Sequence, residues 1–72
     1  DKIEGLDMAE GINVKNDSVI VFKGDSGEWW WRRVDNQNGK EVSRSSEGYE
    51  GATYARHAAH AYNPGVDVFE EE

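Results

Sequence analysis

Two runs rich in hydrophobic residues, separated by a polar stretch, stand in the first half of the chain. Residues 18–23 and 28–34 are rich in β-branched and aromatic side chains, and the turn formers of residues 24–27 lie between them. This pattern is typical of two antiparallel strands joined by a short glycine-containing loop. Alternate side chains of a strand point to opposite faces of a sheet. One face is therefore expected to carry Trp29, Trp31 and Arg33, and the other Glu28, Trp30, Arg32 and Val34.

The rest of the chain is predicted to form a weak strand, then a helix and then a short final strand. Asn38 and Gly39 mark a second turn, after which residues 40–45 form a polar third strand. Residues 52–62 are predicted to form a helix, which ends before Pro64 because proline disfavours the helical conformation in the preceding residue. Residues 66–69 alternate again as a strand. One side of the helix is expected to carry Ala52, Ala55, Ala58, Ala59 and Tyr62.

These elements predict an α+β domain with a small antiparallel sheet of three strands, one helix and one C-terminal strand. We divide the chain into an acidic, poorly ordered arm (residues 1–17), the domain itself (18–69) and an acidic tail (70–72). Ile12 and Val14 alternate with polar residues, so they extend the first strand backwards in one interpretation. Since aromatic residues fall on both faces of the sheet, we expect the helix to cover one face. The other face is then either left in water or covered by another molecule.

The size of the chain bears on its assembly. Seventy-two residues are barely sufficient for a single core, and the chain has no cysteine for a disulfide or a thiolate metal site. Oligomerisation is the usual remaining way to stabilise so small a sheet. Periodicity alone leaves open whether the C-terminal strand pairs within its own chain or in a neighbour's sheet.

The formal net charge of −7 is large for 8.1 kDa. Such a charge repels nucleic acid and favours basic partners, and it equally suits solubility or a protein that lives in high salt. No apolar run approaches membrane-spanning length, and no signal-peptide pattern stands at the N-terminus. We therefore expect no membrane association and a cytoplasmic location, which for a phage protein means the host cytoplasm.

Trp30 and Arg32 are the first candidate binding residues, and three interpretations of them stay open. They form a half-buried pair on the sheet surface, a contact patch for a protein, or a platform for base stacking with arginine at phosphates. Arg33 joins them in the nucleic-acid interpretation. Lys23, Lys40 and Arg44 would then extend a basic strip along the strands.

Two histidines offer a weak candidate for a metal site. His57 and His60 stand three residues apart on the polar side of the predicted helix, but the sequence fixes no third ligand, although Glu47 or Glu50 would be near. No nucleophile motif surrounds the serines, and the glutamates beside Gly48 would repel a phosphate. The sequence therefore predicts neither an enzyme nor a bound cofactor.

The order and spacing of several segments resemble the YegP-like family of short domains of unknown function. The resemblance covers residues 19–62. It rests on Phe22-Lys23, Gly27-Glu28-Trp29, Trp31-Arg32, Asn38-Gly39 and Ser46-Glu47-Gly48-Tyr49 before an alanine-rich helix. It implies a unit of three strands, a helix and a strand, two of which build one continuous sheet with exchanged C-terminal strands. Trp30 and Arg33 depart from the family pattern, which has a polar and an apolar residue there, and no catalytic residues carry over.

These observations predict a non-enzymatic, acidic, homodimeric module that binds another protein. Contacts come from the face with Trp30 and Arg32, or from the acidic C-terminal residues Glu70, Glu71 and Glu72. In the second case the partner is a basic or nucleic-acid-binding protein, recognised by charge complementarity. The alternative is single-stranded nucleic-acid binding through the strand that carries the tryptophans and arginines.

Overall fold

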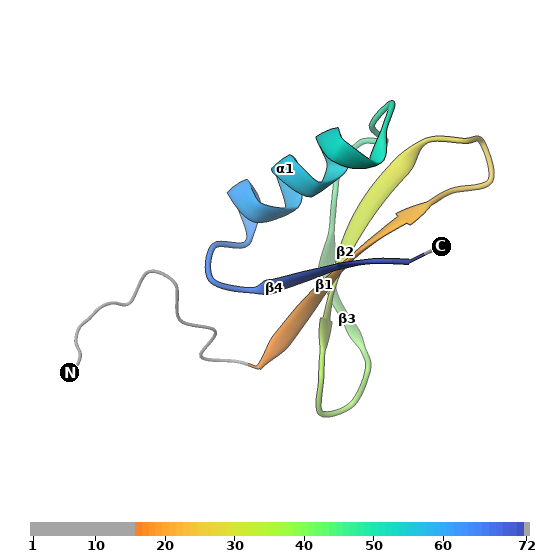
Figure 1. Cartoon of the computed structure of the whole chain (residues 1–72). Coiled ribbons are helices and arrows are strands. Elements are labelled where there is room, and N and C mark those ends of the chain that lie inside the picture. Colours follow the sequence, from red (N-terminus) through yellow and green to blue (C-terminus); the bar gives the residue numbers. More distant parts are fainter. Residues whose placement is uncertain (1–15, 72) are drawn as a thin grey trace.

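The structure, a computed structural model, describes residues 16–71 as one sheet and one helix (Figure 1). The elements in chain order are β1 (Asp17–Lys23), β2 (Trp29–Asp35), β3 (Glu41–Arg44), α1 (Ala52–Tyr62) and β4 (Asp67–Glu70). The predicted α+β class and element order are confirmed, and the predicted helix has the observed bounds. Among the described residues, no helix combines the length and hydropathy needed to cross a bilayer.

The four strands lie in the order β3-β2-β1-β4, and the last strand runs parallel to β1. The sheet is therefore mixed, whereas the sequence analysis described it as antiparallel. The helix explains the difference. The helix carries the chain back to the end of the sheet at which β3 begins, so β4 runs in the same direction as β3 and, through the two antiparallel pairs, as β1. In this single chain, β4 pairs with β1 of its own sheet.

The helix covers one face of the sheet only. Its buried residues Ala55 and Ala59 pack against Val19, Val21 and Trp31 in the core. Alanine has no side chain beyond Cβ, so the helix backbone can approach the sheet despite the bulk of the tryptophan beneath it. Figure 1 shows α1 on one side of the strands, with nothing layered on the other side within the described chain.

A polar cluster fastens the C-terminal end of α1 to the first two strands. The Arg33 Nε donates to a carboxylate oxygen of Asp17 at 2.7 Å, and a second guanidinium nitrogen lies 3.4 Å from the side-chain oxygen of Asn63. Asn63 in turn donates from its side chain to the carbonyl of Ala59 at 2.9 Å. Asp17 is only 2% exposed, while the Arg33 side chain is 23% exposed. The cluster thus supplies hydrogen-bond donors to a carboxylate and a helix carbonyl that the packing removes from water.

Two residues assigned to the flanking segments belong to the sheet. Asp17 opens β1 and is buried, although the sequence analysis placed it in the arm. Glu70 closes β4, although it was placed in the tail. Ile12 and Val14, which one interpretation added to the first strand, lie outside the described residues.

Replacing Asp17 tests the polar cluster. Asp17→Ala removes the carboxylate that faces the half-buried Arg33 guanidinium, so we expect the free energy of unfolding to fall by about 2 kcal/mol. Urea unfolding followed by tryptophan fluorescence measures the change. Glu41→Ala is the matched control, because it removes an exposed arginine–carboxylate pair that Arg44 makes at 2.8 Å. Equal effects of the two substitutions would contradict a special role for the buried pair.

Candidate functional site

The strand register places an aromatic and aliphatic surface on the uncovered face of the sheet. Phe22 lies opposite Trp30, and Ile20 lies opposite Arg32 on β2 and Phe69 on β4. Residues opposite one another in a ladder share a face, and this face is not the one that α1 covers. We call the following set the open face: Ile20, Phe22, Trp30, Arg32, Val34 and Phe69.

Arg32 and Trp30 are held in place on the open face by their neighbours. The Arg32 guanidinium carbon lies 5.9 Å from the centre of the Phe22 ring, within cation–π range. The Trp30 indole lies so close to Gly24 that a Cβ added there would stand 3.0 Å from its Nε1. The patch of Trp30 and Arg32 expected from the sequence is therefore one continuous surface with Phe22.

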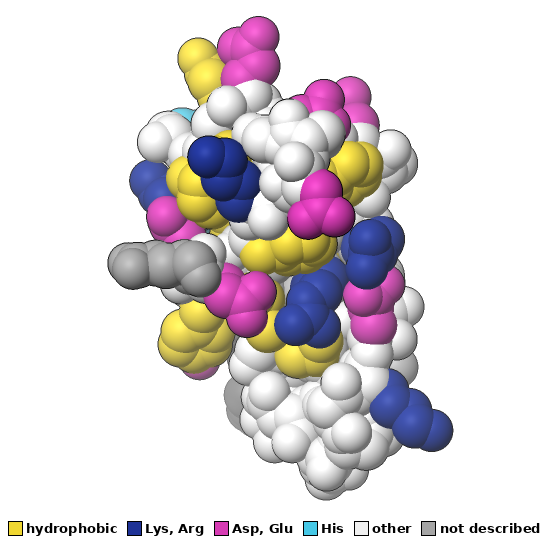
Figure 2. Space-filling model, turned by 90° about the vertical axis from the view of Figure 1, so that its right-hand side faces the viewer, with side chains coloured by type: hydrophobic (Ala, Val, Ile, Leu, Met, Phe, Trp, Pro, Cys, Tyr) yellow, Lys and Arg dark blue, Asp and Glu magenta, His cyan; other side chains and the backbone are white. Residues whose placement is uncertain are grey.

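One end of the open face is hollowed. A shallow depression of about 390 Å³ has apolar walls of Ile20, Val34 and Phe69, with Glu70 and Glu71 at the β4 side. Phe69 is 55% exposed, which is unusual for a phenylalanine. The side of the molecule drawn in Figure 2 shows hydrophobic side chains interleaved with basic and acidic ones. The depression offers a site for an apolar side chain with charged groups at its border.

Arg33 does not join Trp30 and Arg32 on the open face. It lies on the face beneath α1, where it contacts Asp17 and Asn63. Its departure from the apolar residue of the YegP-like pattern thus has a structural explanation, because a buried carboxylate and a helix end surround it. Arg33, which was expected to support nucleic-acid binding, instead contacts residues within the fold.

Two of the acidic C-terminal residues also make contacts within the fold. Glu70 forms an ion pair with Arg56 of α1, and the backbone N–H of Glu71 donates to the carbonyl of Val21 at 2.8 Å. Glu72 lies outside the described residues. Glu70 thus presents less uncompensated charge to a partner than the sequence suggests.

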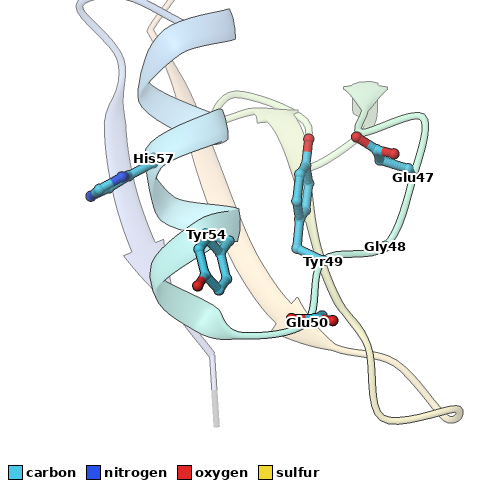
Figure 3. Close-up of a pocket in the computed structure, with 6 residues that line it drawn as sticks. All are labelled: Glu47, Gly48, Tyr49, Glu50, Tyr54 and His57. Carbon is cyan, nitrogen blue, oxygen red and sulfur yellow. The ribbon is translucent and has the colours of Figure 1, made fainter.

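His57 and His60 are both exposed on α1. Within residues 16–71, no group of three or more histidine, cysteine, aspartate or glutamate side chains is arranged to hold a metal ion. His57 instead borders a hollow with Glu47 and Glu50, and Figure 3 shows its ring directed away from Tyr49.

Tyr49 is the residue that the sequence analysis missed. The backbone of the connection after β3 pairs with β2, since Tyr49 and Trp29 exchange two hydrogen bonds of 2.7 Å. Earlier in the same connection, the N–H of Ser45 donates to the carbonyl of Trp31 at 2.9 Å. The pairing brings the Tyr49 ring against the core. Its position one residue after Gly48 in a polar connection gave no periodic signal.

The environment of Tyr49 alters its acidity. Partial burial raises the pKa of the Tyr49 hydroxyl above its ordinary value, and the negative charge of Glu47 raises it further. The buried indole N–H of Trp31 completes no hydrogen bond, but it lies near enough to the hydroxyl to offset part of this rise in pKa. The fold therefore favours the neutral phenol.

Comparisons with known proteins find no matching family model, no similar curated protein and no similar solved structure. The resemblance to the YegP-like family therefore stays a prediction, and function is argued from the geometry alone.

Tyr49 should make the stability of the domain depend on pH in the alkaline range. Because its pKa is raised in the fold, the folded chain keeps a proton that the unfolded chain loses, and stability falls as the pH rises above about 10. We expect Tyr49→Phe to remove this part of the alkaline loss of stability. Urea unfolding of both proteins at pH 7 and above pH 10 measures the difference. An identical alkaline loss in the variant would contradict it.

Proposed function

We propose that this domain is a non-enzymatic protein-interaction module that binds its partner through the open face. The observation that supports the proposal is the one-sided packing of the sheet. Trp30 and Phe22 stand opposite one another on that face, with Arg32 stacked on Phe22. Tryptophan and arginine are the residue types most enriched among the dominant contacts of protein interfaces.

Burial of the open face supplies a reason for binding. An enclosed tryptophan or phenylalanine buries roughly 150–250 Å² of surface, and apolar surface contributes about 25 cal/mol per Å² when it leaves water. A partner that covers Trp30 and Phe69 would gain this stabilisation. The net charge of −7 favours a basic partner, including a nucleic-acid-binding protein, through charge complementarity and faster encounter.

The open face is tested by capture with matched variants. The immobilised chain is incubated with lysate of its source, or of its host, after nuclease treatment. We expect a stoichiometric protein to be retained, and the double variant Arg32→Glu, Phe69→Ser to lower retention at least about tenfold. His60→Ser is the control, since His60 is exposed on α1, which packs on the opposite side of the sheet, and it borders none of the hollows described. Retention that is unchanged by the double variant would refute the open face as the binding surface.

Single-stranded nucleic acid is the second candidate ligand, because the aromatic rings of Trp30 and Phe22 share the open face with Arg32. Stacking of bases on these rings predicts quenching of tryptophan fluorescence by oligonucleotides, lost in Trp30→Leu. The internal role of Arg33 and the net charge argue against this candidate. Quenching at low salt that depends on Trp30 would make it the preferred function.

Homodimerisation is a separate proposal. Residues 16–71 leave one side of the sheet uncovered, and β4 is a short edge strand that follows the turn at Pro64 and Gly65. Exchange of β4 between two chains would keep its pairing with β1 while joining the subunits. We expect light scattering at micromolar concentration to give twice the 8.1 kDa mass of one chain. A mass near 8.1 kDa would refute the dimer.

A pair of introduced cysteines distinguishes exchange from other dimers. Ser18 and Asp67 are opposite in the β1–β4 register, and the chain has no cysteine of its own. In the variant Ser18→Cys, Asp67→Cys, an exchanged strand yields a covalent dimer on oxidation. Pairing within one chain yields a covalent monomer, which would refute exchange but leave the dimer mass unaffected.

A further inference from the structure

All three tyrosines of the chain border two adjoining hollows beside α1. The first hollow, of about 220 Å³, has aromatic walls of Trp31, Tyr49 and Tyr62. The second, of about 370 Å³, lies between Tyr49 and Tyr54. Because Tyr49 borders both hollows, they are neighbours. We call the aromatic residues of the two hollows the tyrosine strip: Trp31, Tyr49, Tyr54 and Tyr62.

Tyr54 and Tyr62 are exposed and available for contact, whereas Tyr49 is partly buried and Trp31 is buried beneath them. Tyr62 stacks on Trp31 with ring centres 6.1 Å apart, yet it remains 70% exposed. Figure 3 shows the rings of Tyr49 and Tyr54 rising from the connection and from α1, on two sides of the second hollow. Trp31 belongs to the helix-covered side of the sheet, so the strip is a surface distinct from the open face.

The polar groups around the first hollow are suited to a ligand that presents hydrogen-bond acceptors. Arg44 can only donate, and the hydroxyls of Ser46, Tyr49 and Tyr62 can donate as well. Glu41 already holds the Arg44 guanidinium in a two-pronged pair at 2.8 and 2.9 Å, which makes an anionic ligand less favourable. A proline-rich backbone offers carbonyl oxygens and lacks N–H groups at its prolines. Such a segment matches the hydrogen-bond donors and the aromatic walls of the first hollow.

The second hollow is suited to a positive charge. Glu47 and Glu50 border it, and within residues 16–71 neither carboxylate forms an ion pair. The charge of Glu47 already acts on the Tyr49 hydroxyl. A lysine or arginine head group between the two tyrosine rings would gain cation–π attraction together with the attraction of the carboxylates.

We propose that the tyrosine strip binds a proline-rich segment of a partner protein that carries a basic residue. Proline rings pack on Tyr49 and on Tyr62, which itself stacks on the buried Trp31, and the basic side chain enters the second hollow. Proline-rich segments are extended before they bind, so docking on an aromatic surface costs them little conformational entropy. A second copy of this chain fits poorly, because it has one proline and would bring a second Glu47 and Glu50 to the site.

Nuclear magnetic resonance on the full chain labelled with nitrogen-15 tests the site. Three indole N–H signals report separately on Trp29, Trp30 and Trp31, and single Trp→Phe variants assign them. The probes are a peptide of about ten prolines ending in arginine and the same peptide ending in glutamine. We expect both peptides to shift the Trp31 indole and the Tyr49 amide while leaving the Trp30 indole unchanged. The arginine peptide should bind about threefold to tenfold more tightly at low salt.

Variants of exposed residues separate binding from folding. Tyr62→Ala should weaken binding of both peptides roughly tenfold through loss of one aromatic wall, whereas Val42→Ala, also at an exposed hydrophobic residue, should leave binding unchanged. The double variant Glu47→Gln, Glu50→Gln should abolish the preference for arginine. The proposal is overturned if millimolar peptide shifts none of these signals, or if the shifts fall on Trp30. It is also overturned if argininamide alone binds as tightly as the arginine peptide.

Discussion

One helix covers one face of a four-stranded sheet, and this constraint governs the rest of the molecule. Ala55 and Ala59 lie fully buried against Val19 and Val21. The sheet therefore separates the helix from the far face, and no helix side chain reaches it. A helix of eleven residues is about 16 Å long, so it also leaves the ends of the strands uncovered. The exposed aromatic groups on the open face and beside the ends of α1 are the direct consequence of this packing. Both proposed binding surfaces arise from it.

The buried Asp17–Arg33 pair gives the small core a second anchor. Arginine beneath a helix is costly unless its charge and its donors are matched, and here a carboxylate and an amide oxygen match them. Asn63 links the same cluster to the last turn of α1 through the carbonyl of Ala59. The helix end, β1 and β2 are therefore coupled at a point where the core has few apolar residues. Of the two arginines of β2, Arg33 consequently has a structural role, while Arg32 lies half-buried on the open face.

The two surfaces differ in the ligand they favour. The open face combines aromatic and aliphatic groups around Arg32 and suits the flat surface of a folded protein. The tyrosine strip is narrow, has donors at one end and carboxylates at the other, and suits an extended basic segment.

The sequence alone determined the elements of this fold, because their signals are local. Runs of β-branched and aromatic residues marked β1 and β2, alanine spacing marked α1, and turn formers marked the breaks between them. It also placed Trp30 and Arg32 on one face, since strand geometry fixes the alternation. Only the tertiary structure decided the parallel direction of β4, the pairing of Arg33 with Asp17, and the packing of Tyr49 against the core. Each depends on contacts between residues distant in sequence, for which periodicity carries no information.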